Sequence, residues 1–478
     1  MPKSNTIETF EDIKKKSLHS NMESLQRIGI IQSPSTKKNP LKKMICNLLT
    51  AFTFLIGIPT LIGQILALFH FWDNLFILFS GLFNFVALVL CYILGVHGVI
   101  MKDDIMQLFV TFKDELLIKT ENVGIKEKTR EIFAETSKKA HHMTMYILTI
   151  LVTLMVLWAP VPFYTHYTED RNATRSAEED EARWLHFCFL IWFPVDIRVT
   201  PFYEIMYLSQ CLIFYVNLSH IHSVGITMAS FIVHIGGQFE ILSKAIEDMD
   251  TFLETTDIQD KMQRNQTMMR KTMKEHAKHS PPHFHIKTGV PKDLNENIHA
   301  LSIYGSDGDK LEFILDYPEQ REYILNIVNL HQAVIEFSRE VNRVAGPVIL
   351  ALLFICQFLT CLMIFLLTLE WKQGTRKAEN FARYAIAGLC AISFSFELCW
   401  HGENAKQSSR RLADAIYESQ WYRHTVTFNR DLFMIKELAQ KEVTFSGGNF
   451  YVLSLETFGE MMNTMYTLYT LLQNAYEG

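Results

Sequence analysis

Long runs of apolar residues alternate with charged stretches along this 478-residue chain. A helix needs about 20 apolar residues to cross the hydrocarbon core of a bilayer, because it rises about 1.5 Å per residue. The pattern therefore predicts an all-α membrane protein with seven transmembrane helices. The seven apolar segments are residues 44–69, 75–100, 142–164, 203–232, 346–369, 384–400 and 453–474.

The composition agrees with this class of protein. Apolar residues make up 49% of the chain and aromatic residues 12%, which is too apolar for an ordinary soluble enzyme. Seven of the eight cysteines lie in or beside apolar segments, and only Cys188 lies clearly in a loop. We therefore expect buried thiols rather than a disulfide framework.

The positions of Lys and Arg predict how the chain is oriented. Nine basic residues precede Met44, against four acidic ones, and residues 102–139 contain eight more basic residues. Residues 166–200 contain four basic and seven acidic residues. Because cytoplasmic segments carry the excess of Lys and Arg, the N-terminus is expected in the cytoplasm and the C-terminus outside.

The polar stretches indicate how the chain is divided. Apolar residues on both sides of a long His- and Pro-rich stretch have helical spacing, so they are expected to extend the fourth and fifth helices into the cytoplasm as stalks. The stalks and the helices before the last segment could pack into an intracellular anchor domain, where subunits would meet. The expected divisions are a cytoplasmic segment (1–43), transmembrane helices 1–4 (44–239) with an outer loop (166–202), stalks and mobile loop (240–345), transmembrane helices 5 and 6 (346–400), anchor helices (401–449) and the last transmembrane helix (450–478).

Two clusters of titratable residues were considered as reactive sites. The four histidines between residues 276 and 285 lie in a stretch without fixed spacing, which favours a solvated loop over a metal site. Glu397, His401 and Glu403 lie at the inner end of the sixth helix, where an interfacial cap is the simpler interpretation. We expect no catalytic residues, no metal, no cofactor and no nucleic-acid partner.

The C-terminal part of the chain resembles the signature of insect odorant receptors. From Glu397 it reads ELCWHGENAKQSSRRLADAIYESQWYRHTVTFNRDLFMIKELAQKEVTFSGGNFYVLSLETFGEMMNTMYTLYTLLQ. Two more segments resemble the family's second outer loop with the start of the fourth helix, and the exit from that helix. These read WFPVDIRVTPFYEIMYLSQ (192–210) and HIGGQFEILSKAI (234–246), and together the matching segments cover about a third of the chain. The ending YTLYTLLQ differs from that of the shared co-receptor, so the chain is not identified as the co-receptor.

The resemblance implies an odorant-gated, non-selective cation channel of four subunits in the plasma membrane of sensory neurons. Its implied partners are a small volatile odorant, membrane lipid, and either identical subunits or an odorant-receptor co-receptor. The alternatives are a gustatory-type channel, because Gln473 resembles that branch, and a secondary transporter. The chain shows no internal repeat, which disfavours the transporter.

The last apolar segment is speckled with hydroxyl and amide side chains, which suggests that one face meets water. Residues three and four apart share a helix face, and four such faces would surround a pore with hydroxyls below and a leucine constriction near the outer end. A hydrophobic ring of this kind blocks ions by dewetting. The alternative is that the leucines face lipid or neighbouring helices. The resemblance implies Leu471 as the gate and Leu468 as the next best match. The predicted pore face comprises Thr464, Thr467, Leu468, Leu471, Leu472 and Ala475.

The resemblance also implies a ligand pocket in the outer half of the membrane, among the second, third, fourth and sixth helices. A pocket for a volatile needs apolar and aromatic walls with one or two polar groups. Tyr92, Trp158 and Tyr384 are the strongest candidates, because each combines an aromatic face with a hydrogen-bonding tip. Packing within the bundle is the alternative for each candidate. The candidates are Val89, Tyr92, Ile93, Met155, Trp158, Gln210, Ile213, Phe214, Phe381 and Tyr384.

Three Asn-x-Ser/Thr sequons test the predicted orientation. We expect Asn172, in the outer loop, to carry a glycan, and Asn217 and Asn265 to carry none. Peptide mass spectrometry with and without glycosidase treatment measures this directly. A glycan on Asn265 would place the long polar stretch outside the cell and contradict the predicted orientation.

Overall fold

Six helical stretches within the described residues are long and apolar enough to cross a membrane. The computed structural model describes residues 9–32, 38–169, 183–254, 267, 270–271, 317–373, 378–448 and 450–477. The seventh predicted segment is also a helix, α19 (Leu455–Glu477), but it contains no stretch as apolar as those that identify the other six. The six stretches are Pro40–His70, Leu75–Ile100, Lys126–Thr168, Phe202–Glu247, Arg321–Lys372 and Phe381–Glu418.

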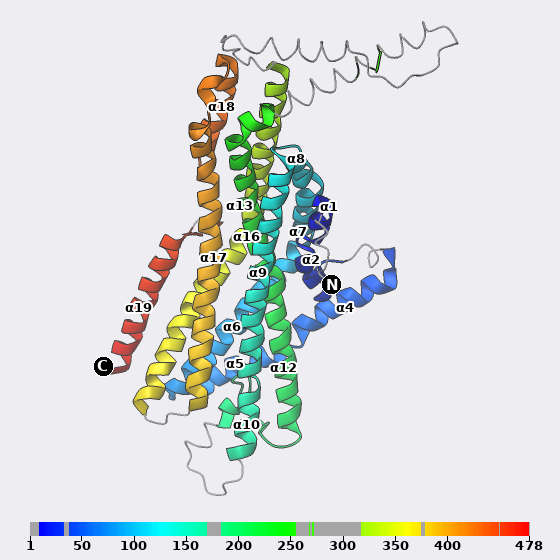
Figure 1. Cartoon of the computed structure of the whole chain (residues 1–478). Helices are drawn as coiled ribbons and strands as arrows, with labels where there is room; N and C mark the ends of the chain where they lie inside the picture. Colours follow the sequence, from blue (N-terminus) through cyan, green and yellow to red (C-terminus); the bar gives the residue numbers. More distant parts are fainter. Residues whose placement is uncertain are drawn as a thin grey trace, which may run out of the picture.

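The helices form an elongated bundle in which α19 lies at one side (Figure 1). The elements before the outer loop are α1 (Phe10–Lys16), α2 (His19–Arg27), α4 (Pro40–Leu55), α5 (Ile58–His70), α6 (Leu75–Ile100), α7 (Lys102–Val110), the π-helix η1 (Thr111–Leu116), α8 (Leu117–Glu121), α9 (Lys126–Trp158) and α10 (Pro160–Glu169). The elements from the outer loop onward are the 3₁₀ turn η2 (Arg183–His186), α12 (Phe202–His220), the π-helix η3 (Ile221–Gly225), α13 (Ile226–Glu247), α16 (Tyr317–Gln373), α17 (Ala378–Glu418), the 3₁₀ turn η4 (Trp421–Arg423), α18 (Val426–Ala439), the antiparallel pair β1 (Ser446–Gly447) and β2 (Tyr451–Val452), and α19.

The first apolar segment is not one continuous helix, in contrast to the prediction for residues 44–69. It breaks at Gly57, between α4 and α5, where Pro59 follows within the first turn of α5. The last turn of a helix leaves carbonyl groups without intrahelical donors. The Tyr92 hydroxyl donates a hydrogen bond to one of them, the carbonyl of Phe54, at 2.9 Å. Gly57 is required here because a Cβ atom would collide with that hydroxyl.

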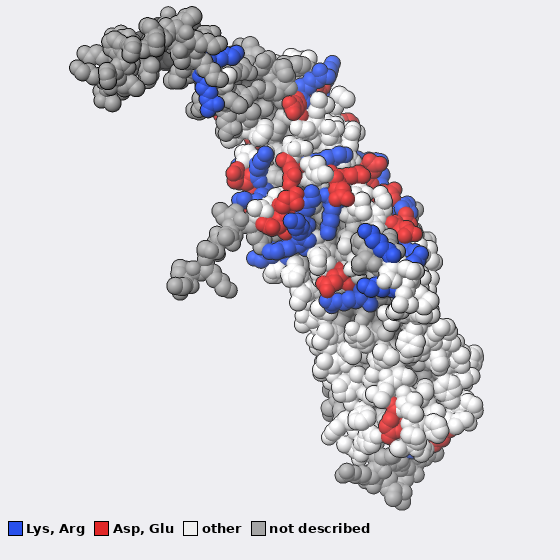
Figure 2. All heavy atoms as spheres, turned by 90° about the vertical axis from the view of Figure 1, so that its right-hand side faces the viewer, with Lys and Arg blue, Asp and Glu red and all other residues white. Residues whose placement is uncertain are grey.

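Two helices extend far beyond the thickness of a bilayer. Helix α16 has 57 residues and α17 has 41, and 57 residues correspond to about 85 Å against a hydrocarbon core of about 30 Å. The N-terminal part of α16 packs against α13, whose residues are nearly all buried. Helices α13 and α16 thus extend well beyond the expected membrane segments, and their place in the cytoplasm stays a prediction. Charged residues gather over this half of the molecule, and the other half is mostly uncharged on the face shown in Figure 2.

A short hairpin fixes the start of α19 on α16. The Gly447–Gly448 pair lies at the turn of this hairpin, and Gly448 has the positive φ of +56° that favours glycine. The Ser446 N–H donates to the Asn342 side chain at 2.8 Å. A Cβ atom on Gly447 would lie 2.8 Å from the backbone nitrogen of Leu350, so the hairpin approaches the α16 backbone directly.

One face of α19 is held against α16 by polar contacts along its length. The Gln357 amide donates to the carbonyl of Met461 at 3.3 Å. Further along, the hydroxyls of Thr368 and Tyr469 lie 3.1 Å apart. These contacts fix the rotation of α19 about its axis, and they leave its opposite face without a neighbour in the described chain.

We predict that Gly447→Ala destabilises the packing of α19 on α16 by about 1–3 kcal/mol, because the added methyl group meets the α16 backbone. Gly459→Ala, within α19, is the matched control, since a Cβ there meets nothing within 4 Å. Replacing a helical glycine by alanine should stabilise the protein by about 0.5–1 kcal/mol. Thermal unfolding of the purified full chain measures both changes. Equal or reversed shifts of the unfolding temperature in the two variants would contradict the close approach of the hairpin to the α16 backbone.

Candidate functional site

A cavity of about 90 Å³ lies inside the membrane half of the bundle, between α6, α9, α12 and the outer loop. Its walls are mostly apolar and aromatic, as expected for a site that holds a small apolar molecule. A ligand larger than a few atoms would need the lining side chains to move. The lining residues are Phe83, Asn84, Ala87, Leu88, Cys91, Leu154, Trp158, Phe189, Phe214, Asn217 and Leu218.

The loop between α10 and α12, which is the predicted outer loop, closes this cavity at the end of the bundle opposite α18 (Figure 1). Residues 187–191 are all buried, so the loop folds into the bundle rather than lying on its surface. The Gln210 side chain accepts from the Phe189 N–H at 3.1 Å and donates to the Phe189 carbonyl at 3.2 Å. The Trp158 indole N–H donates to the carbonyl of Cys188 at 3.0 Å. Two cavity-lining aromatic residues, Trp158 and Phe189, are therefore fixed by the same contacts that hold the loop.

Two buried asparagines supply polar groups to the cavity. Asn84 comes from α6 and Asn217 from α12, and both are less than a tenth exposed. The amide nitrogen of Asn217 has no hydrogen-bond partner in the part of the chain that the structure describes. A buried donor without a partner costs about 1–3 kcal/mol. A ligand with an oxygen acceptor would remove this cost, which makes Asn217 the strongest candidate for a polar contact.

An aromatic cluster lies beside the cavity near the loop. The rings of Trp158 and Tyr384 lie 6.1 Å apart, and the Arg383 guanidinium lies 4.3 Å from the centre of the Trp158 ring. The hydroxyl groups of Tyr384 and Ser80 are 2.9 Å apart. Helix α17 therefore contributes to the site through its contact with Trp158, although none of its residues lines the cavity.

The predicted ligand residues fall into distinct groups. Trp158 and Phe214 line the cavity. Gln210 and Tyr384 support lining residues, as described above. Tyr92 does not line the cavity, because its hydroxyl serves the break between α4 and α5. The others lie outside the lining: Ile93 and Phe381 are exposed, Ile213 is buried, and Val89 and Met155 are half-buried.

On α6 the predicted ligand residues and the observed lining residues differ by a rotation about the helix axis. The predicted Val89 and Tyr92 each follow a lining residue, Leu88 and Cys91, by one position. One residue corresponds to about 100° around a helix. Helix α6 is apolar on every side, so the spacing of its apolar residues does not reveal the inner face. Asn84 was the missed signal, since a polar residue in a membrane helix faces the interior of the bundle.

The outward face of α19 carries most of the predicted pore residues. Thr464, Thr467, Leu468 and Leu471 are exposed in the single chain, Leu471 by 60%. Leu472 is half-buried, and the side chain of Ala475 lies outside what the structure describes.

The threonines on this face keep an acceptor free. The Thr464 hydroxyl donates to the Glu460 carbonyl at 2.9 Å, and the Thr467 hydroxyl donates to the Asn463 carbonyl at 3.0 Å. A hydroxyl that has donated its proton still has oxygen lone pairs to offer. Such oxygens can accept from water or contact a cation.

The remaining candidates are placed as follows. His401 Nε2 lies 3.2 Å from a Glu397 carboxylate oxygen, and the Glu403 carboxylate accepts from Gln407, within one helix. Groups of His, Cys, Asp and Glu that could hold a metal are not found among the described residues. Asn172, Asn265 and the histidine-rich stretch lie outside the described residues.

The chain was compared with protein families and with characterised proteins. The family model described as 7tm odorant receptor matches residues 82–466. Odorant receptor 49a of Drosophila melanogaster is 24% identical over 156 residues, which is 33% of this chain and 38% of that protein. Odorant receptor 10 of Aedes albopictus is 24% identical over 156 residues, which is 32% of this chain and 40% of that protein. These matches span about two fifths of the length of the curated relatives.

Solved structures share the fold over nearly the whole length. The insect olfactory receptor OR5 from Machilis hrabei, in complex with eugenol, matches with a TM-score of 0.67 and 13% identity, covering 95% of this chain and 99% of that one. The OR5 structure described without eugenol matches with a TM-score of 0.64 and 13% identity, covering 94% and 97%.

Proposed function

We propose that this chain, which belongs to the 7tm odorant receptor family, forms an odorant-gated cation channel. A small, mostly apolar volatile would bind among the membrane helices and open a pore lined by α19. The observation that carries this proposal is the exposed, partly polar face of α19 on a helix whose other face is fixed to α16.

The exposed face of α19 is poorly suited to lipid. It presents Asn463, Thr464 and Thr467 together with Leu468 and Leu471. Polar side chains in membrane segments are costly and usually face the interior of a bundle or a water-filled cavity. Four copies of this face around an axis would enclose water beside the polar residues and form a leucine ring at Leu471. Because no Asp or Glu lies beside that ring, the pore would select weakly among cations.

Assembly into tetramers is supported by a second surface, on α18. This helix lies in the half of the molecule where charged residues gather, and it exposes large apolar side chains to solvent (Figures 1 and 2). Val426 is 86% exposed, and Met434 and Leu438 are also exposed. Membrane helices gain little hydrophobic driving force from association in lipid, so apolar surface in water must contribute. The partners would be identical subunits or an odorant-receptor co-receptor.

The proposed ligand site is the cavity that contains Trp158 and Asn217. Its apolar walls suit a volatile, and the unpaired Asn217 amide suits a ligand with one oxygen acceptor. Eugenol, the ligand in the complex of the Machilis hrabei receptor, is an aromatic volatile with oxygen acceptors and serves as a probe for this chain. Because it is larger than the cavity of about 90 Å³, its binding would require the lining side chains to move. The proposed location is the plasma membrane of sensory neurons, with the N-terminus in the cytoplasm.

Filling the cavity should reduce the response to ligand. We predict that Ala87→Phe shifts the half-maximal concentration of an activating volatile, chosen from a panel that includes eugenol, at least tenfold upward. Ile93→Phe is the matched control, because Ile93 is on the same helix but exposed on another face. Currents in cells that express the chain with a co-receptor measure both variants.

In the same assay Asn217→Leu should weaken the binding of oxygen-bearing ligands by about tenfold and change the binding of hydrocarbon analogues by less than twofold, because it removes the polar amide and keeps a side chain of similar size. An equal loss of ligand sensitivity in Ala87→Phe and Ile93→Phe would contradict the assignment of this cavity as the ligand site.

Replacing the proposed gate should allow current without ligand. We predict that Leu471→Ser raises the basal current, because a polar ring stays wet and loses about 1–3 kcal/mol of leucine burial per subunit. This loss shifts the closed–open equilibrium tenfold or more. Leu471→Phe should keep the pore closed. Thr464→Ala should alter conductance or ion preference with little leak.

Tyr469→Ser tests the rotation of α19, since Tyr469 faces Thr368 on α16 and not the pore. An unchanged basal current in Leu471→Ser, together with a leak in Tyr469→Ser, would place the pore on the other face.

A further inference from the structure

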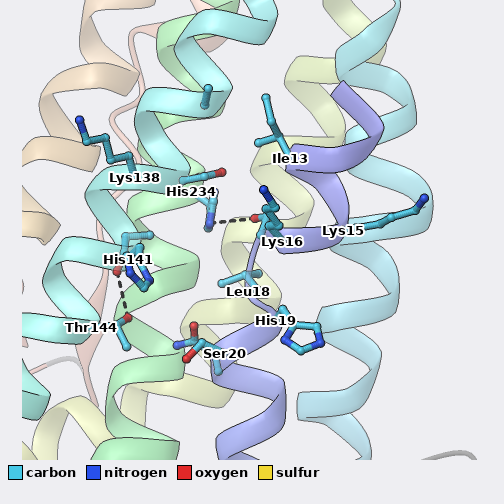
Figure 3. A pocket seen from close by; sticks show the side chains of 15 residues that line it. Ile13, Lys15, Lys16, Leu18, His19, Ser20, Lys138, His141, Thr144 and His234 are labelled. Carbon is cyan, nitrogen blue, oxygen red and sulfur yellow. Dashed lines mark hydrogen bonds between the residues drawn. The ribbon is translucent and has the colours of Figure 1, made fainter. Parts of the chain in front are cut away.

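A second and larger hollow, of about 660 Å³, lies where the N-terminal helices meet the bundle. The turn between α1 and α2 forms one wall, α9 forms the other, and His234 of α13 lies between them (Figure 3). We call this hollow the N-terminal cleft. It is lined by Ile13, Lys15, Lys16, Ser17, Leu18, His19, Ser20, Asn21, Ala134, Ser137, Lys138, Ala140, His141, Thr144 and His234.

The lining of the N-terminal cleft is basic. It contains three lysines and three histidines, and none of the lining residues is acidic. The neighbouring acids lie near basic groups both inside and outside the lining. Glu23 lies 4.0 Å from His19 of the lining, and hydrogen bonds from Thr9 together with the charges of Lys15 and Lys16 lower the pKa of Asp12. Glu11 lies 3.7 Å from Lys14, and Glu135 lies 3.1 Å from Lys139.

Burial lowers the pKa of His234 to about 3, so this histidine is neutral and the positive charge of the lining comes from its lysines. Three lysines and no carboxylate on the lining favour an anion.

The start of α2 adds backbone donors to this field. Helix α2 has nine residues and begins at His19, and no side chain caps its N-terminus. The first N–H groups of a helix have no intrahelical acceptor, and the helix dipole places partial positive charge there. His19, Ser20 and Asn21 line the cleft at this end of the helix.

Buried polar groups in the cleft provide independent support for a ligand. His234 is only 1% exposed, and its Nε2 lies 3.2 Å from the Ser17 hydroxyl oxygen. Its Nδ1 has no hydrogen-bond partner within the described residues, and the same is true of the buried hydroxyl of Ser137. Unpaired buried groups of this kind cost about 1–3 kcal/mol each, so both would gain from a ligand with several oxygens.

The depth of the cleft indicates where such a ligand would come from. His141 and Thr144 line it at the start of the apolar part of α9, which is predicted to enter the membrane at residue 142. Figure 2 looks onto the side that carries α1 and α2, and its basic residues extend to the level where the uncharged surface begins. Lipid headgroups occupy this boundary.

We propose that the N-terminal cleft binds the phosphomonoester groups of an anionic lipid headgroup, as in a phosphoinositide. A phosphomonoester carries up to two negative charges and several acceptor oxygens, which suit a site with lysines, histidines and backbone N–H groups. The phosphodiester of phosphatidylcholine carries only one negative charge and two terminal oxygens, and its headgroup also bears a positive charge. A bound headgroup would contact α1, α2 and α9 together and so hold the N-terminal helices against the bundle.

The test uses the purified full chain in detergent and a fluorescent, short-chain phosphatidylinositol 4,5-bisphosphate, with binding followed by anisotropy. Lys16→Gln with Lys138→Gln removes one charge from each wall. Lys14→Gln with Lys139→Gln is the matched control, since it removes neighbouring charges on the same two helices outside the cleft. Short-chain phosphatidylcholine and phosphatidylserine test the phosphomonoester requirement, and inositol 1,4,5-trisphosphate tests a soluble source.

We expect the Lys16/Lys138 pair to weaken phosphoinositide binding about tenfold or more and the control pair to change it by less than twofold, since each lysine near a headgroup contributes about 1 kcal/mol. Ser137→Ala should also weaken binding, with unchanged thermal unfolding of the unliganded protein. An equal loss of phosphoinositide binding in both lysine pairs would overturn the proposed site. Binding of phosphatidylserine as tight as that of the phosphoinositide would also overturn it. Tight binding of inositol trisphosphate without binding of the lipid would overturn the membrane source.

Discussion

Polar groups inside a membrane protein have no water to bond with, and the fold of this chain depends on pairing them within the bundle. Gln210 binds both backbone groups of Phe189 and so draws the outer loop inward. Tyr384 reaches Ser80 and joins α17 to α6. Gln357 holds the backbone of α19 at Met461. Each of these bonds joins segments that are far apart in the sequence, and together they set the positions of the loop, the cavity and the last helix.

The same constraint identifies the places where the chain is incomplete by itself. The buried amide nitrogen of Asn217 has no hydrogen-bond partner among the described residues. The outward face of α19 presents amides and hydroxyls where a membrane protein would otherwise show apolar side chains to lipid. An oxygen of a bound ligand would accept a hydrogen bond from Asn217, and water in the pore would bond with the polar face of α19. The exposed side chains of α18 present the opposite mismatch, because they are apolar and lie in the half of the molecule that is expected to face water. The proposed ligand site, pore and subunit interface would each provide these groups with the surroundings that the single chain lacks.

Length and apolar content were sufficient to predict the helices, because a bilayer sets their minimum length, and helical spacing predicted the stalks. The rotation of each helix was not predictable in the same way. Helix α6 is apolar on all sides, so the spacing of its residues does not show which face lines the cavity. The predicted ligand residues Val89 and Tyr92 therefore lie one position away from the lining residues Leu88 and Cys91. The inward fold of residues 187–191 depends on contacts with α9 and α12 that no local pattern records. Helix α19 differs from α6, since it mixes polar and apolar residues. Its Tyr469 contacts Thr368 of α16, and the pore face predicted from the spacing of its residues stays a prediction.

The central claim is that the chain itself forms a pore that ligand opens. Single-channel recording tests this most directly, in inside-out patches excised from cells that express the chain alone or with a co-receptor. The patches are bathed in solution without nucleotides, so that G-protein signalling is absent. The account predicts discrete current steps when an activating volatile is added, and the steps should persist after prolonged washing. A saturable flux without discrete steps would indicate a transporter, and a response that disappears with the nucleotides would indicate an indirect receptor; either result would contradict the account.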